Sequence, residues 1–247
     1  MKSAIPNTLT LTNLLCGCLC LICIFTNKID LLPYFFFMAL LMDYVDGFIA
    51  RALKVSSDLG KELDSLADMV SFGVVPGALF YFLINKTLNI TQADFENTAT
   101  LWGLVGFVVT LFSCLRLAKF NLDDRQADSF IGLNTPSCTT FVLGITLCVH
   151  YQVYGLDKYL ENFYLLLGLA LLLSYLLVSE IPMFSFKFKS LDWKSNRFRL
   201  GFIAWVIISL LILPLGLALS AVVLSYIFFS IILWLGGYIS IPKRTQG

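Results

Sequence analysis

The feature that most restricts the fold is a series of eight hydrophobic segments, which together occupy most of the chain. Each segment approaches the ~20 residues that an α-helix needs to cross a lipid bilayer. Backbone polar groups find no water in the bilayer core, so segments of this length are expected to be helical. They lie at about residues 9–26, 31–53, 61–84, 98–119, 134–153, 161–180, 199–217 and 219–240, with a tight turn near Pro214 and Gly216 between the last two.

Composition also favours a membrane protein over a soluble one. Of the 247 residues, 58% are hydrophobic and 13% are charged, whereas soluble domains carry roughly 25% charged residues. We therefore expect an all-α polytopic membrane bundle of about eight transmembrane helices, forming a single integral membrane domain over residues 1–247. The net charge of +1 gives no reason to expect a nucleic acid as partner.

Lysine and arginine residues predict how the helices are oriented. With the N-terminus inside, all but three of the 17 Lys and Arg residues lie on the cytoplasmic side, the exceptions being Lys28, Lys86 and Lys158. This bias follows the positive-inside rule and places both termini, together with the loops near residues 54–60, 120–133 and 181–198, in the cytoplasm. Because no organelle-targeting segment is visible, we expect the inner (cytoplasmic) membrane of a bacterium or an archaeon.

Four aspartates lie where the second and third segments approach the cytoplasm. Asp43 and Asp46 are three residues apart, and Asp64 and Asp68 are four apart, so on helices each pair shares one face. The short connection makes the two helices antiparallel neighbours, so the pairs can face each other. Carboxylates are costly at membrane depth. Facing pairs would form a cage of hard oxygen ligands suited to Mg²⁺ or Mn²⁺.

The residues around the aspartates suit a phosphate ligand. Gly47 and Gly60 allow a bulky group to approach the backbone. Arg51 offers a guanidinium fork, and the Ser57 hydroxyl can donate a hydrogen bond. Two metal ions can hold both the attacking and the leaving oxygen of a phosphoryl displacement. These residue types together favour a metal-bound pyrophosphate as ligand.

Two other interpretations of the aspartates remain open from spacing alone. They could form salt bridges with nearby basic residues (Arg51, Lys54 and Lys61). They could instead be the cation site of a transporter, which the helix interruptions at Gly73, Pro76 and Gly77 would support. A transporter usually places its site at the membrane midplane, whereas these aspartates lie at one end of the helices.

The aspartate motif resembles that of a known enzyme family. The pattern D-x2-D-G-x2-A-R-x8-G-x3-D-x3-D is the signature of the CDP-alcohol phosphotransferases, and it is complete here at Asp43, Asp46, Gly47, Ala50, Arg51, Gly60, Asp64 and Asp68. Flanking sequence is similar to the phosphatidylserine synthase branch of that family. The similar stretches are Pro6-Asn7 leading into Thr10 and Asn13, and residues 63–76, 116–121 and 130–136.

The resemblance implies a reaction and a role for each matching residue. The phosphatidyl group of CDP-diacylglycerol would pass to the hydroxyl of L-serine, giving phosphatidylserine and CMP. The four aspartates, Asp43, Asp46, Asp64 and Asp68, would ligate two divalent ions, Mn²⁺ or Mg²⁺, and Asp68 would also be the general base. CDP-diacylglycerol would be bound by Pro6, Asn7, Thr8, Leu9, Gly47, Arg51, Ser57 and Gly60. The resemblance also implies a homodimer among membrane lipids.

The motif does not select the alcohol acceptor. Serine carries a carboxylate, so a second basic group is expected near the site. We expect Arg116, at the cytoplasmic end of the fourth segment, to bind serine with Asn121 and the 130–136 loop beside it. Two alternatives stay open: Arg116 could be an interfacial anchor, or the acceptor could be another alcohol such as glycerol 3-phosphate. In this scheme the catalytic motif spans 43–68, the acceptor side about 116–136, and the C-terminal helices about 161–240.

Overall fold

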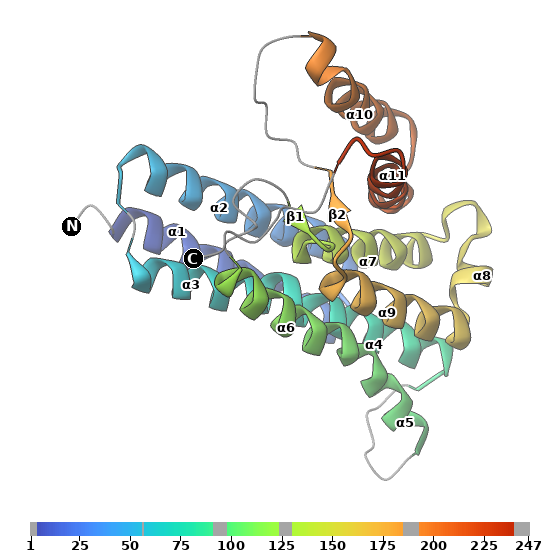
Figure 1. Cartoon of the computed structure of the whole chain (residues 1–247). Helices are drawn as coiled ribbons and strands as arrows, with labels where there is room; N and C mark the ends of the chain where they lie inside the picture. Colours follow the sequence, from blue (N-terminus) through green and yellow to red (C-terminus); the bar gives the residue numbers. More distant parts are fainter. Residues whose placement is uncertain (1–3, 56, 91–97, 124–129, 185–192, 240–247) are drawn as a thin grey trace.

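The protein is a bundle of α-helices in a computed structural model of the chain (Figure 1). The structure describes residues 4–55, 57–90, 98–123, 130–184 and 193–239. The longer helices are α1 (Ala4–Phe25), α2 (Leu32–Ala52), α3 (Asp58–Asp68), α4 (Val75–Thr87), α6 (Val108–Leu122), α7 (Thr135–His150), α9 (Phe163–Val178), α10 (Trp193–Ile212) and α11 (Leu215–Leu235). Short elements join them: η1 (Ile29–Leu31), the π-helical segment η2 (Met69–Val74), α5 (Thr98–Gly103), η3 (Leu104–Phe107), η5 (Val153–Gly155) and α8 (Asp157–Leu160).

Every expected hydrophobic segment corresponds to helix, which confirms the all-α membrane fold. Within the described residues, five helical stretches are long and apolar enough to cross a membrane: Ala4–Phe25, Ile29–Ala52, Asp58–Thr87, Leu101–Leu122 and Leu215–Leu235. Helices α7 and α9 are apolar but shorter. The predicted bounds of the last two segments are shifted, because α10 ends at Ile212 and Pro214 is the N-cap of α11. Proline has no N–H and a fixed φ, so the chain turns there.

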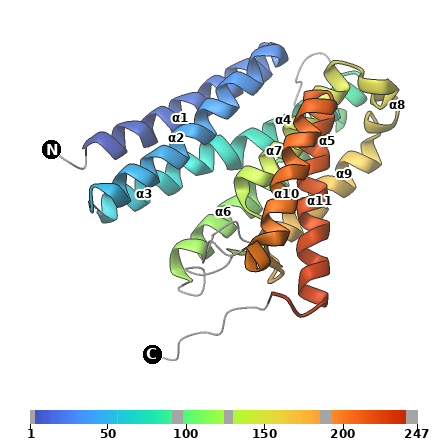
Figure 2. The same cartoon turned by 90° about the horizontal axis from the view of Figure 1, so that it is seen from above.

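The first three helices lie together at the end of the bundle nearest the N-terminus. Helix α1 packs along α2 and also contacts α3, η2 and α4; Figure 2 shows these helices side by side, with α10 and α11 on the other side of the molecule. Helix α7 packs between α4 and α11, and α6 packs against η2 and α9. Both aspartate-bearing helices, α2 and α3, therefore pack against α1, which joins them to the rest of the bundle.

The connection between α2 and α3 is a tight left-handed turn. Lys54 adopts a φ of +53°, the N–H of Lys54 donates to the carbonyl of Arg51, and that of Val55 donates to the carbonyl of Ala50. This geometry satisfies the last carbonyls of α2. The side chain of Ser57 then caps α3 by accepting a hydrogen bond from the N–H of Gly60 at 3.0 Å. The turn makes α2 and α3 antiparallel neighbours, as the short connection predicts.

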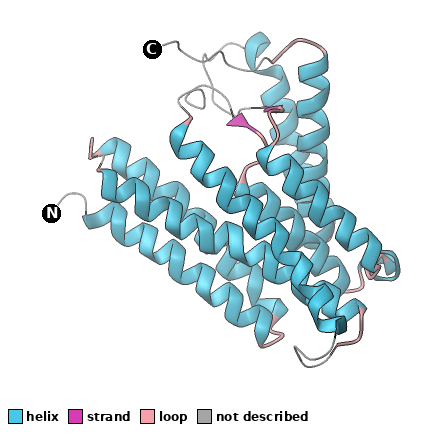
Figure 3. Ribbon diagram, turned by 60° about the horizontal axis from the view of Figure 1, so that its bottom comes forward, coloured by secondary structure: helices cyan, strands magenta, loops and turns pink. Residues whose placement is uncertain are grey.

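Two very short strands fix the region that follows α6. Strand β1 (Phe130–Ile131) pairs antiparallel with β2 (Pro182–Met183), with Ile131 opposite Pro182 (Figure 3). Gly132 has a φ of +73°, and a Cβ there would lie 2.8 Å from the carbonyl oxygen of Leu177, so glycine is required. Asn134 then caps α7 by accepting from the N–H of Ser137 at 2.7 Å. These contacts hold the start of α7 beside α6.

Candidate active site

Three aspartates converge between α2 and α3. One carboxylate oxygen from each of Asp43, Asp64 and Asp68 lies within 4.8 Å of the other two. All three side chains are partly buried. The spacing therefore does bring carboxylates from two antiparallel helices onto facing surfaces, as the sequence predicts.

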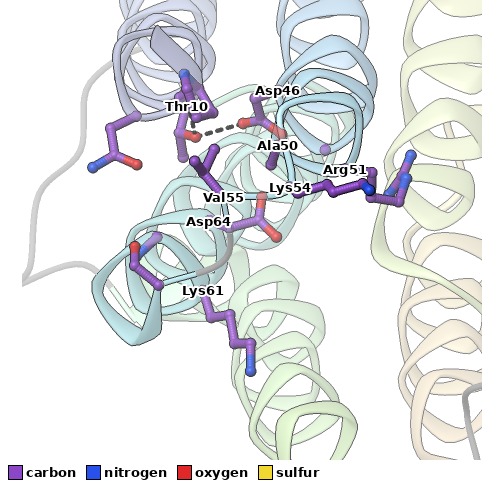
Figure 4. Close-up of a pocket in the computed structure, with 13 residues that line it drawn as sticks. Thr10, Asp46, Ala50, Arg51, Lys54, Val55, Lys61 and Asp64 are labelled. Atoms are coloured by element: carbon purple, nitrogen blue, oxygen red, sulfur yellow. Dashed lines mark hydrogen bonds between the residues drawn. The ribbon is translucent and has the colours of Figure 1, made fainter. Parts of the chain in front are cut away.

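Asp46 lies beside these three but has a different environment. It is 5% exposed and accepts a hydrogen bond from the hydroxyl of Thr10 at 2.5 Å. The same hydroxyl lies 3.1 Å from the carbonyl oxygen of Pro6, one turn earlier in α1. Figure 4 shows the Thr10–Asp46 hydrogen bond, with Asp64 on the neighbouring helix. Thr10 thus ties the N-terminal helix to the aspartate motif, and a metal-binding role for Asp46 stays a prediction.

The aspartate cluster fits a divalent metal ion. The Oδ1 atom of Asp64 is buried and has no hydrogen-bond partner among the described residues, and the same holds for Oδ1 of Asn13. Buried carboxylates without a compensating cation are strongly unfavourable. Three convergent carboxylates provide the hard oxygen donors that Mg²⁺ and Mn²⁺ prefer. A cation between α2 and α3 would satisfy the unpartnered oxygen of Asp64.

A pocket of about 400 Å³ opens next to the cluster (Figure 4). This volume is within the range of small-molecule sites. Six of the eight residues predicted to bind CDP-diacylglycerol line it: Pro6, Asn7, Gly47, Arg51, Ser57 and Gly60. Thr8 is exposed and its hydroxyl donates to the carbonyl of Ala4, and neither Thr8 nor Leu9 lines the pocket. The N-terminal contribution therefore comes from one face of α1.

The two glycines make room for particular neighbours. A Cβ at Gly47 would lie 3.3 Å from Nη1 of Arg51, so glycine allows the guanidinium to lie over the backbone of α2. A Cβ at Gly60 would lie 3.1 Å from Oγ of Ser57 and 3.5 Å from Oδ1 of Asn7. Ser57 is thus the cap of α3 as well as a pocket residue. The N-terminus of α3, which favours anions, opens toward this pocket.

Sequence reasoning did not select four residues that the structure places at the site. Lys54 and Lys61 line the pocket with Arg51. Thr10 binds Asp46, and the Nδ2 of Asn13 lies 3.3 Å from Oδ1 of Asp68. The signal for the lysines is their place close to the motif, since Lys54 lies three residues after Arg51 and Lys61 directly follows Gly60. The signal for Thr10 and Asn13 was two polar residues three apart in an apolar helix, which share one face.

Arg116 is buried and faces the aspartate cluster. It is 8% exposed, and it lies close enough to Asp68 and Tyr226 for electrostatic interaction. Its Nη1 atom lies 3.5 Å from the hydroxyl of Thr135, and its Nε has no hydrogen-bond partner among the described residues. An interfacial anchor extends its charge to water, so this burial argues against the anchor interpretation.

Asn121, the second residue predicted to bind serine, lies in a different environment. It is exposed on the last turn of α6, and its Nδ2 donates to Oγ of Ser65 on α3 at 2.7 Å. This contact joins α6 to the aspartate-bearing helix. Arg116 is therefore the better placed of the two to meet a ligand at Asp68, and the serine-binding role of Asn121 stays a prediction.

The fold and site define a membrane-embedded helical bundle with an acidic metal-type centre and an adjoining basic pocket. Residues 3–181 match the family described as CDP-alcohol phosphatidyltransferase, and the chain belongs to this family. The family uses divalent metals, and the aspartate cluster can bind one.

Curated relatives are similar to the chain over different lengths. CDP-diacylglycerol–serine O-phosphatidyltransferase of Bacillus subtilis is 35% identical over 132 residues, 53% of this chain and 69% of the relative. The enzyme of the same name from Helicobacter pylori strain J99 is 29% identical over 238 residues, covering 93% and 90%. That from Methanocaldococcus jannaschii is 30% identical over 177 residues, covering 72% of each chain.

Proposed function

We propose that the protein transfers the phosphatidyl group of CDP-diacylglycerol to the hydroxyl of L-serine, releasing CMP. The observation that carries this proposal is the convergence of three carboxylates beside a basic pocket, with a buried guanidinium facing one of them. The printed names of the relatives support the same pair of substrates. The loop charges of the sequence support a cytoplasmic site, and the homodimer remains an expectation from the family resemblance.

The aspartates have distinct roles in this scheme. Asp43, Asp64 and Asp68 would hold one Mg²⁺ or Mn²⁺ ion, and Asp46 would contribute to a second. A bound divalent cation supplies positive charge that neutralises the pyrophosphate during displacement. Without it, six or more oxygen atoms of like charge would face one another in a partly buried site, so substrate and metal are expected to bind together.

Asp68 is the general base in this proposal. A serine hydroxyl is a weak nucleophile at neutral pH, so a carboxylate must accept its proton as the oxygen attacks phosphorus. Asn13 contacts Oδ1 of Asp68, which leaves Oδ2 available for the proton. Among the residues described, Asp68 is also the aspartate on which the charge of Arg116 acts most directly.

The pocket orients the donor and Arg116 orients the acceptor. Arg51, Lys54 and Lys61 surround the space next to Asp46 and Asp64, where they would neutralise the pyrophosphate oxygens that the metal leaves free. Pro6 and Asn7 form the opposite wall, on the cytidine side. Arg116 would bind the serine carboxylate and place the hydroxyl beside Asp68. The Nε–H of Arg116, which has no partner in the described part of the chain, is available for that contact.

The test is CMP release by purified protein in detergent, with CDP-diacylglycerol and Mn²⁺ or Mg²⁺. Serine, glycerol 3-phosphate, inositol 1-phosphate and choline are added one at a time. We expect metal-dependent release with serine. Release with a different alcohol would keep the aspartate chemistry and overturn the assignment of Arg116. No metal-dependent release with any acceptor would overturn the transferase and return the cation transporter to consideration.

A further inference from the structure

The helix that carries Asp64 and Asp68 changes its geometry immediately after Asp68. Residues Met69–Val74 form a π-helical segment, in which the N–H of Val75 donates to the carbonyl of Val70, five residues back. The sequence supplies a cause at Pro76. In a regular α-helix the carbonyl of Phe72 would accept from residue 76, but proline has no N–H and its ring crowds that carbonyl. The helix widens instead of ending.

A neighbouring helix replaces the missing donor. The hydroxyl of Thr139 on α7 donates to the carbonyl oxygen of Phe72 at 3.0 Å, and both residues are 0% exposed. Freed carbonyls in apolar surroundings need such partners, and threonine hydroxyls commonly provide them in membrane helices. Thr139 therefore provides a partner for the carbonyl that Pro76 cannot pair in regular α-helical geometry.

Two further contacts hold the same segment. The hydroxyl of Thr110 on α6 donates to the carbonyl oxygen of Gly73 at 2.9 Å. The hydroxyl of Ser71 donates to the carbonyl oxygen of Asn13 on α1 at 3.0 Å. The π-helical segment is thus tied to three helices, and one of its contacts is the backbone of the residue whose side chain meets Asp68.

The direction of Asp68 depends on this segment. Helix α4, which follows it, is fixed by packing because Val75, Ala78, Leu79, Leu83 and Ile84 are all at most 1% exposed. A turn closed by i→i+5 bonds contains an extra residue relative to an α-helical turn. Loss of the π turn would therefore rotate Asp64 and Asp68 relative to the fixed α4, away from Asp43 on α2.

We propose that Thr139 is a positioning residue for the transfer reaction, which holds the π-helical segment and thereby aims Asp68 at the acceptor hydroxyl. The same hydroxyl lies 2.9 Å from the carbonyl oxygen of Thr135, so its single hydrogen is shared between the carbonyls of Phe72 and Thr135. The hydroxyl of Thr135 accepts from Arg116. The buried hydroxyl of Thr139 therefore links the π-helical segment that follows Asp68 to the first turn of α7, which contacts Arg116. This inference rests on the proposed function.

The experiment compares four variants in the CMP-release assay. Thr139→Val removes the hydroxyl while keeping the side-chain shape. We expect kcat to fall by about tenfold to a hundredfold, because small misplacement of a reacting group has effects of that order. The KM for serine should stay within about twofold, because Thr139 does not contact the acceptor. The Mn²⁺ concentration needed for half-maximal rate should rise, because the same rotation moves Asp64 and Asp68 away from Asp43, so kcat is compared at saturating Mn²⁺. Thr139→Ser retains the hydroxyl and should restore kcat.

Thr146→Val is the matched control. Thr146 lies two turns further along α7, is also 0% exposed, and its hydroxyl bonds within its own helix to the carbonyl of Val142. We expect wild-type kcat from this variant. Equal losses in Thr139→Val and Thr146→Val would show a general effect of removing buried hydroxyls from α7 and would overturn the proposal.

A second variant covers the case in which Thr139→Val does not fold. Thr110→Val removes the donor to the neighbouring carbonyl from a partly buried position, and it should lower kcat at saturating Mn²⁺ in the same direction without changing the KM for serine. An unchanged kcat in whichever variant folds, beside an active wild type, overturns the positioning role alone. An inactive wild type overturns the proposed function.

Discussion

Acidic side chains occupy both ends of the bundle, and their surroundings differ. At one end, Asp43, Asp64 and Asp68 converge on one another, and an oxygen of Asp64 lacks any partner among the described residues. At the other end, Asp30 accepts from the hydroxyl of Tyr151 at 2.7 Å and lies 3.1 Å from Nε2 of His150. Glu161 there pairs with Lys86 at 2.9 Å.

The two groups of acidic residues differ in whether protein groups satisfy their charges. The Asp30 side chain is 65% exposed and is satisfied by the protein, so its contacts join the start of α2 to the end of α7 and need no ligand. The aspartates at the other end repel one another unless a cation binds between them. Carboxylates held together without partners store unfavourable energy that ligand binding can relieve, which is typical of functional sites.

The largest expected effect is loss of the base. Asp68→Asn keeps size and one oxygen but cannot accept the serine proton, so CMP release should fall by about 10²–10⁴-fold, the usual contribution of general base catalysis. Binding of CDP-diacylglycerol should be largely retained. Asp30→Asn makes the same change at the satisfied end and should leave kcat unaltered. Appreciable turnover by Asp68→Asn would contradict the role of Asp68.

The second effect concerns metal-dependent donor binding. Asp43→Ala removes one of the three convergent carboxylates, and a divalent ion then has too few protein ligands to be held. We expect CDP-diacylglycerol binding at a fixed Mn²⁺ concentration to weaken by at least about tenfold. The affinity is measured by titrating CDP-diacylglycerol into each protein, with and without Mn²⁺. Unchanged binding would show that the cluster does not hold the ion.

The third effect should fall on a single substrate. Arg116→Ala removes the buried guanidinium, so the KM for serine should rise by about tenfold to a hundredfold, as expected for a charge-assisted contact of roughly 1.5–3 kcal/mol. The KM for CDP-diacylglycerol should change far less, because Arg116 lies outside the donor pocket. Arg197→Ala, an exposed arginine on α10, is the control. Equal effects on both substrates would argue against a serine-binding role.

The sequence predicts what depends on local pattern and fails where tertiary contacts decide. Helix positions follow from apolar length, and the facing aspartates follow from i,i+3 and i,i+4 spacing across a short turn. The sequence marks Pro76 as an interruption, but it does not show the consequence, which is a π-helical segment whose Phe72 carbonyl accepts from Thr139. A threonine in an apolar helix often bonds within its own turn, as Thr146 does, so only packing shows which hydroxyl has a second role.

The burial of Arg116 was equally beyond the sequence. An arginine at the end of a hydrophobic segment can extend to water or turn inward, and the choice depends on what packs over it. Here the start of α7 lies beside Arg116, where Asn134 caps the helix and Thr135 offers its hydroxyl. Gly132 allows that approach through its positive φ. Those contacts join residues far apart in the chain.

The smallest expected effect lies at the satisfied end and concerns pH. Donation of its hydroxyl to Asp30 raises the pKa of Tyr151 above the usual value of 10.0. Because the folded pKa exceeds the unfolded one, this bond contributes stability below about pH 10 and is lost as the pH rises through the folded pKa. Wild type and Tyr151→Phe should therefore differ slightly in melting temperature at pH 8 and converge at more alkaline pH, with equal CMP release at pH 8. A clear loss of activity in Tyr151→Phe would contradict this comparison, because it would show that the end of the bundle with Asp30 contributes to the reaction.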